Sequence, residues 1–185
     1  MFDDFISCAE WLISSGWNRP DRLAMEGGSN GGLLVGATLT QRPDLFGACI
    51  SEVGVLDMLR FHRWTSGAWW VGDYGSSDDP EQFAWLYAYS PVHRVKEGVA
   101  YPATLVMAGD HDDHVVPGHS LKFAAALQAA QSGSAPVLLR VDFDTGHGAG
   151  KPLAKQIASR TDALTFLVQA LELEPCILGR QEETV

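Results

Sequence analysis

The chain has 185 residues, of which 46% are hydrophobic and 19% charged, the balance of a globular domain with a core of its own. Thirteen Lys and Arg residues against 23 Asp and Glu residues give a formal net charge of −10. This charge, without any cluster of basic residues, argues against nucleic acid or an anionic membrane surface as a partner.

The patterns along the chain predict helices and strands in alternation. Apolar residues at helical spacing favour a helix over residues 2–16. A short strand is expected at 21–26, a helix at 30–41 and a buried strand at 46–55. Residues 56–96 are irregular and rich in aromatics, with short helices at 56–62 and 80–89. The remaining expected elements are a strand at 103–109, a helix at 117–131, a strand at 136–142 and a helix at 152–173, before a loose tail over 174–185.

The expected strands are apolar runs rather than alternations of apolar and polar residues. Such runs are typical of a parallel sheet that is covered by helices on both faces. No linker or internal repeat divides the chain. We therefore expect one α/β domain over residues 1–173.

The three cysteines, at positions 8, 49 and 176, are widely spaced and odd in number, which favours reduced thiols over a disulfide framework. No apolar run approaches the roughly 18 residues that a membrane span needs. Residues 1–16 lack the basic start of a signal peptide. These observations predict a cytoplasmic protein with no membrane partner.

The segment Gly27-Gly28-Ser29-Asn30-Gly31 fits the pattern G-x-S-x-G and falls between an expected strand and an expected helix. In such an elbow the serine hydroxyl stands at the carboxyl edge of the sheet, where the start of the helix directs free N–H groups toward a negative oxygen. The pentapeptide alone is equally compatible with a Gly-rich turn capped by serine, or with a phosphate loop. A Walker or dinucleotide loop is disfavoured by the glycine spacing and the missing lysine.

A nucleophilic serine needs a base and an orienting acid, which follow in the order Ser, Asp, His in an elbow fold. His147 lies between two glycines after the strand at 136–142, as the base should. The acid is ambiguous from the pattern, because Asp110, Asp112 and Asp113 all follow the strand at 103–109.

The same acidic loop has two other interpretations. The side chains of His111, Asp112, His114 and His119 offer ligands for a metal ion. The spacing disfavours a metal, since neighbours in an extended loop point opposite ways. A solvated acidic loop without chemistry is the other alternative.

Several motifs resemble the prolyl oligopeptidase (prolyl endopeptidase) family: "EGGSNGGLLV", "GDYG", "YSPVHRV", "YPATLVMAGDHDDHVVPGHSLKFAAALQ" and "GHGAGKP". The resemblance runs from about Phe2 to Leu173. It implies a serine peptidase of α/β-hydrolase fold that cuts short peptides after proline, with no metal or organic cofactor. It also implies that Ser29 is the nucleophile, that Asp112 is the acid and that His147 is the general base.

The resemblance extends to substrate binding. It makes the backbone N–H of Asn30 an oxyanion donor, and it implies a proline pocket with Trp70, Tyr74, Val55 and Val115 in its walls. An indole face suits the flat proline ring. For the neighbouring Trp69 we expect simple core packing. At position 114 the family has a substrate-gripping arginine, which this chain replaces with His114.

The resemblance covers only about the last quarter of a family member. The implied fold is therefore the C-terminal half of an α/β-hydrolase, with no β-propeller in this chain. The nucleophile strand would then form a sheet edge, open to a missing N-terminal segment or to self-association. A catalytically silent fragment or binding module is an alternative function. Another is a serine esterase or aminopeptidase, against which "GDYG" and Trp70 argue.

Overall fold

The computed structural model describes residues 1–148 and 150–174. In this part of the chain the strands are β1 (Ala24–Gly28), β2 (Ala48–Glu52), β3 (Ala103–Gly109) and β4 (Val137–Asp142). The α-helices are α1 (Phe2–Ser14), α2 (Asn30–Gln41), α3 (Val71–Tyr74), α4 (Pro80–Tyr89), α5 (Pro91–Arg94), α6 (Gly118–Ala130) and α7 (Leu153–Ala170). Short 3-10 helices are η1 (Pro20–Arg22), η2 (Pro43–Leu45), η3 (Phe61–Arg63) and η4 (Thr65–Trp70).

The four strands form one parallel sheet in the order β1-β2-β3-β4, as expected from their apolar sequences. Glu52 at the end of β2 pairs with Gly28 of β1 and with Met107 of β3. The carboxyl ends of the strands are therefore aligned, and the loops that follow them open at one edge of the sheet. In the described sheet β1 is an outer strand.

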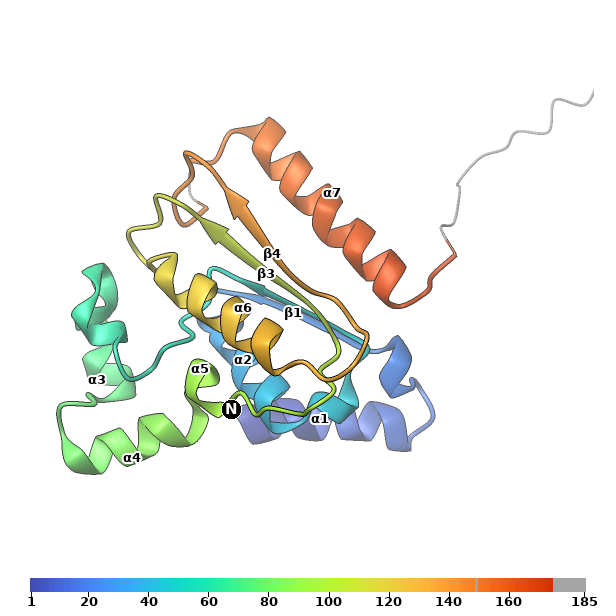
Figure 1. Cartoon of the computed structure of the whole chain (residues 1–185), viewed down its shortest axis with the longest axis horizontal. Helices are drawn as coiled ribbons and strands as arrows, with labels where there is room; N and C mark the ends of the chain where they lie inside the picture. Colours follow the sequence, from blue (N-terminus) through green and yellow to red (C-terminus); the bar gives the residue numbers. More distant parts are fainter. Residues whose placement is uncertain (149, 175–185) are drawn as a thin grey trace, which may run out of the picture.

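Helices cover both faces of the sheet (Figure 1). On one face, residues of α1, α2 and α6 pack against Met25, Cys49 and Val106. On the other face, Ala163 and Phe166 of α7 pack against Ala48, Ile50, Ala103, Leu105 and Met107. The chain is thus a three-layer α/β structure, and the expectation of a doubly covered parallel sheet is confirmed.

Local sequence accounts for several helix and strand boundaries. The Asp79 carboxylate caps α4 by accepting the N–H groups of Glu81 and Gln82, and Pro80 occupies the first turn. The first strand begins at Ala24 rather than at 21, because Pro20 starts the 3-10 turn η1.

One expectation about these elements is wrong. Residues 56–62 form no α-helix: a turn at 58–60 leads into the 3-10 helix η3, and the Met58 N–H donates to Ser90 Oγ. The strand β4 is only partly buried, with Leu138 46% exposed and Leu139 36% exposed, because it is the other outer strand.

The expected tail lies outside the described residues from position 175 onward, and so does Cys176. Cys8 and Cys49 carry free thiols, the first exposed and the second buried. Within residues 1–148 and 150–174, no helix has both the length and the apolar character to cross a membrane.

Candidate active site

Ser29 occupies a strained turn between β1 and α2. Its φ of 58° and ψ of −117° lie in a region that residues with a side chain rarely adopt. Two backbone hydrogen bonds hold this conformation: Ser29 N–H donates to the Glu52 carbonyl at 2.9 Å, and Leu33 N–H donates to the Ser29 carbonyl at 3.1 Å. The turn therefore places the serine at the carboxyl edge of the sheet, directly before the helix.

Glycine is required at two places around this turn. A Cβ at Gly27 would lie 2.4 Å from the Gly31 carbonyl oxygen, and one at Gly32 would lie 2.6 Å from the Gly54 Cα. A Cβ at Gly31 would meet nothing within 4 Å. The strand and helix pass close together at Gly27, and α2 approaches the loop after β2 at Gly32.

The first N–H groups of α2, beginning with Asn30, have no partner within the helix and lie beside Ser29. The Asn30 side chain bonds elsewhere: its Oδ1 accepts the Tyr74 hydroxyl at 2.7 Å. The elbow is thereby connected to α3, which carries Tyr74 and lies far away in the sequence.

Asp112 and His147 meet through a 2.7 Å hydrogen bond between Oδ2 and Nδ1. The Asp112 side chain is fully buried, and its Oδ1 accepts the N–H groups of His114 and Val115, each at 2.9 Å. Three donors around this buried carboxylate satisfy its oxygens and fix its orientation. With Nδ1 bonded to Asp112, the Nε2 of His147 remains available for proton transfer.

The other two candidate acids lie elsewhere. Asp113 is exposed. Asp110 contacts the His111 ring and the Thr145 N–H. Of the three candidate aspartates, Asp112 is the one that contacts His147.

Ser29 is not joined to this pair by a hydrogen bond. Among the described residues its hydroxyl has no hydrogen-bond partner, whereas the Asp112–His147 contact is formed. The structure thus joins Asp112 to His147 and, within the described residues, leaves the Ser29 hydroxyl without a partner at the same edge of the sheet.

An apolar cluster contains the four residues expected to line a proline pocket. Val55 and Val115 are buried in it, and Trp70 and Tyr74 pack against it. The Tyr74 ring meets Phe61 edge-on at 5.5 Å, and burial together with the charge of Asp73 raises the pKa of Tyr74. These four residues lie far apart in the sequence, so the fold brings them together.

The expectation for Trp69 is wrong. Its side chain is 81% exposed, while that of Trp70 packs against the apolar cluster. Both residues end the 3-10 helix η4, in which neighbouring side chains point about 120° apart. Only one of the two tryptophans can therefore face the cluster.

His114 is exposed, and its ring stacks on that of His147. Its ring is nearly parallel to that of His147, at an angle of 21° and with centroids 5.3 Å apart. The residue that replaces the family arginine is therefore in contact with the expected base.

A second buried polar group, which sequence reasoning missed, supports the loop that carries Val55. The Asp57 carboxylate is fully buried and pairs with Lys122 of α6. Burial would raise the pKa of Asp57, but the hydrogen bond and charge of Lys122 lower it below its usual value. His119 is also buried, which lowers its pKa to about 4. The sequence signal was a charged residue inside the apolar run "VGVLDML".

Two of the residues that could have formed a metal site, Asp112 and His119, are engaged in separate hydrogen bonds. Asp112 bonds to His147, while His119 Nδ1 accepts the N–H groups of Leu56 and Asp57. Asp110, His111 and Asp144, by contrast, have potential ligand atoms within 4.8 Å of one another at the exposed end of the same loop.

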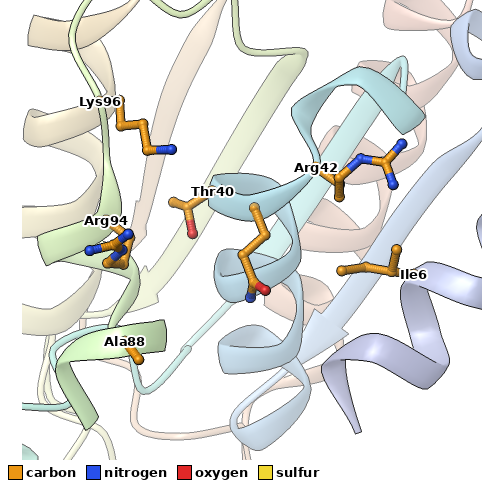
Figure 2. Close-up of a pocket in the computed structure, with 7 residues that line it drawn as sticks. Ile6, Thr40, Arg42, Ala88, Arg94 and Lys96 are labelled. Atoms are coloured by element: carbon orange, nitrogen blue, oxygen red, sulfur yellow. The ribbon is translucent and has the colours of Figure 1, made fainter. Parts of the chain in front are cut away.

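The described part of the chain has a small hollow beside His147 and a larger one at the far end of α2. The small one, of about 70 Å³, is lined by His147 together with Glu52, Met107 and Thr145. A larger one, of about 430 Å³, lies at the other end of α2, lined by Ile6, Thr40, Gln41, Arg42, Ala88, Arg94 and Lys96 (Figure 2). The larger hollow begins eleven residues of α2 away from Ser29, so it does not belong to the Ser29 site.

A parallel sheet that leads into a strained serine turn, with a hydrogen-bonded Asp–His pair in loops after two later strands, defines an α/β-hydrolase domain. Residues 1–174 match the model of the prolyl oligopeptidase family, and the chain belongs to this family.

Among its relatives are prolyl endopeptidases from Elizabethkingia meningoseptica, 47% identical over 94% of this chain, and from Dictyostelium discoideum, 49% identical over 94%. These alignments cover 25% and 23% of the two relatives. A post-proline cleaving enzyme from Rickettsia typhi has a similar structure, with a TM-score of 0.89 at 34% identity over 94% of this chain and 25% of that one. The chain therefore spans about a quarter of the length of the proteins it matches.

Prolyl oligopeptidase B from Galerina marginata is also similar, with a TM-score of 0.89 and 41% identity over 94% of this chain and 24% of that one. Its substrate-bound structures carry single alanine replacements of a serine, an aspartate or a histidine, which follow one another in that order along its chain. The order of Ser29, Asp112 and His147 here is the same.

Proposed function

We propose that this chain supplies the catalytic residues of a serine peptidase that cleaves short peptides after proline. The observation that carries the proposal is the 2.7 Å hydrogen bond between Asp112 and His147 at the sheet edge where Ser29 occupies a strained turn. In the proposed reaction, His147 Nε2 takes the Ser29 proton as Oγ attacks the substrate carbonyl, and later returns it to the leaving amine. Asp112 holds the ring and stabilises the imidazolium.

The apolar cluster supports the choice of substrate class. Trp70 offers an aromatic face beside Val55 and Val115, in a position to receive a flat apolar ring. The relatives named prolyl endopeptidase and post-proline cleaving enzyme favour the same specificity. The Asn30 N–H at the start of α2 is the proposed oxyanion donor.

Labelling with a fluorophosphonate probe tests the nucleophile. We expect Ser29 to be labelled, the Ser29→Ala and His147→Ala variants to remain unlabelled, and a Ser66→Ala control to react like the parent. Ser66 is a suitable control because it lies near the loop that carries Asp112: its hydroxyl donates to the Asp113 carbonyl. Equal labelling of the parent and Ser29→Ala would contradict the proposal.

A second candidate is a chain that is silent by itself. It is favoured by the Ser29 hydroxyl, which has no hydrogen-bond partner among the described residues, and by the quarter-length match to the relatives. A folded parent that resists the probe, but is labelled at Ser29 when joined to the remaining segment of a relative, would support this second function.

A further inference from the structure

The loop that carries Asp112 is attached to the loop that carries His147 at a second place, where Asp110 and Thr145 each stand two residues before the side chains that meet. Asp110 Oδ1 accepts the Thr145 N–H at 3.1 Å, and the His111 N–H donates to the Thr145 carbonyl at 3.1 Å. The N–H and the carbonyl of Thr145, which precedes His147 by two residues, are therefore both bonded to the loop that carries Asp112.

Close packing also holds the loop of Asp110 against the loop of Thr145. Thr145 is only 6% exposed. A Cβ at Gly109 would lie 2.4 Å from the Thr145 carbonyl oxygen and 2.6 Å from that of Gly146. The two loops touch through backbone at this point, so the hydrogen bonds of Thr145 are held at short range without intervening side chains.

Asp110 is suited to hold a backbone donor because it carries a full charge. Its Oδ1 also lies 2.8 Å from His111 Nδ1. The hydrogen bond from His111 and those from the Thr145 and Asp144 backbones lower the pKa of Asp110 to about 2. A charged acceptor binds an N–H group more strongly than a neutral one does.

We propose that Asp110 is a positioning residue, which holds the His147 loop so that the ring meets Asp112. Asp110 does not contact His147 itself. Its effect passes through Thr145, whose position fixes the start of the short Gly146-His147 segment. The importance of Asp110 for catalysis rests on the proposed function. Its effect on the Asp112–His147 hydrogen bond does not.

Proton NMR of the full chain tests the proposal without substrate. The His147 Nδ1–H, bonded to a buried carboxylate, should give a low-field resonance that disappears in His147→Gln. In Asp110→Ala we expect this proton and the Thr145 amide to exchange with water about 10- to 100-fold faster, the size expected when a hydrogen bond to a charged acceptor is lost. Asp110→Asn, which keeps an acceptor oxygen, should restore much of the protection.

Asp113→Ala is the matched control, because Asp113 is an exposed carboxylate in the same loop. It should leave both exchange rates unchanged. The proposal is overturned if the parent lacks the low-field resonance, or if Asp110→Ala protects it as well as Asp113→Ala does. Should Asp110→Ala fail to fold, Asp110→Asn is compared with Asp113→Asn: faster exchange of the two protons in Asp110→Asn alone supports the role of the charged acceptor, and equal exchange in both variants refutes it. A chain that shows the Asp110 effect but resists the fluorophosphonate probe would contradict the proposed function alone.

Discussion

The imidazole rings of His114 and His147 lie nearly parallel, with centroids 5.3 Å apart. His114 therefore borders the space in which a substrate would approach the base. Because arginine offers a fixed fork of donors on a longer arm, His114→Arg should bind a blocked proline peptide about three- to tenfold more tightly. Chemical-shift titration would measure this, with His114→Gln as the uncharged control. Equal Kd values for the Arg and Gln variants would show that position 114 does not contact the peptide.

The two neighbouring aspartates, Asp112 and Asp113, should differ greatly in their importance. Asp112→Asn replaces the buried acceptor of the His147 proton and leaves the ring in the wrong tautomer, which should slow fluorophosphonate labelling about 10⁴-fold. Asp113→Asn changes an exposed side chain and should leave the rate nearly unchanged. Comparable losses in the two variants would contradict the assignment of the acid.

The two adjacent tryptophans provide a test of specificity. Trp70→Ala should weaken binding of a proline peptide by about 1 kcal/mol or more, because the ring that packs at the apolar cluster is lost. Trp69→Ala removes a side chain that is 81% exposed and should have little effect. The two Kd values, measured by the same titration, give the comparison. A larger loss in Trp69→Ala would place the proline pocket elsewhere.

His119 should make the fold sensitive to mild acid. Its pKa is about 4 in the folded chain and near 6.5 when unfolded, so the unfolded state binds more protons between these values. The contribution of His119 to stability is therefore complete above about pH 6.5 and decreases as the pH falls toward 4. At pH 4.5 the loss should reach about 2 to 3 kcal/mol.

Urea unfolding of the parent and of His119→Asn at pH 7 and pH 4.5 would measure this loss. The asparagine oxygen can accept the same backbone N–H groups without titrating. The stability difference between the two proteins should shrink by about 2 to 3 kcal/mol at the lower pH. An unchanged difference would show that protonation of His119 does not destabilise the fold.

The outer position of β1 predicts self-association of the isolated chain. A parallel outer strand presents unpaired backbone groups, which favour pairing with another chain. We expect oligomers or aggregation in sedimentation velocity, increasing with concentration, and only slight activity on proline peptides. A monodisperse monomer that cleaves such a peptide as fast as a full-length relative does would contradict both expectations.

The sequence predicts correctly those structural features that depend on residues close together in the chain. Gly27 at the Ser29 turn, the apolar runs of the strands and the proline at the start of α4 each act within a few residues, and the structure agrees with them. The family resemblance selected Asp112 among three aspartates, and it stands beside His147.

The remaining features depend on contacts between distant segments. The Asp57–Lys122 pair joins the loop after β2 to α6, and no local pattern marks the two as partners. Which of Trp69 and Trp70 faces the cluster depends on the rotation of a short 3-10 helix, and the partial burial of β4 depends on its place at the edge of the sheet. Local sequence contains neither kind of information.

Asp112 and His147 lie in the loops that follow the adjacent strands β3 and β4, whereas Ser29 follows β1, the outer strand on the other side of the sheet. The distance between Asp112 and His147 is therefore set by one pair of neighbouring strands, and changes at the Ser29 turn leave it unaltered. The gap between Ser29 and His147 instead spans the centre of the sheet. Small changes in strand twist would tune that gap, so reactivity can be adjusted by mutations far from all three residues.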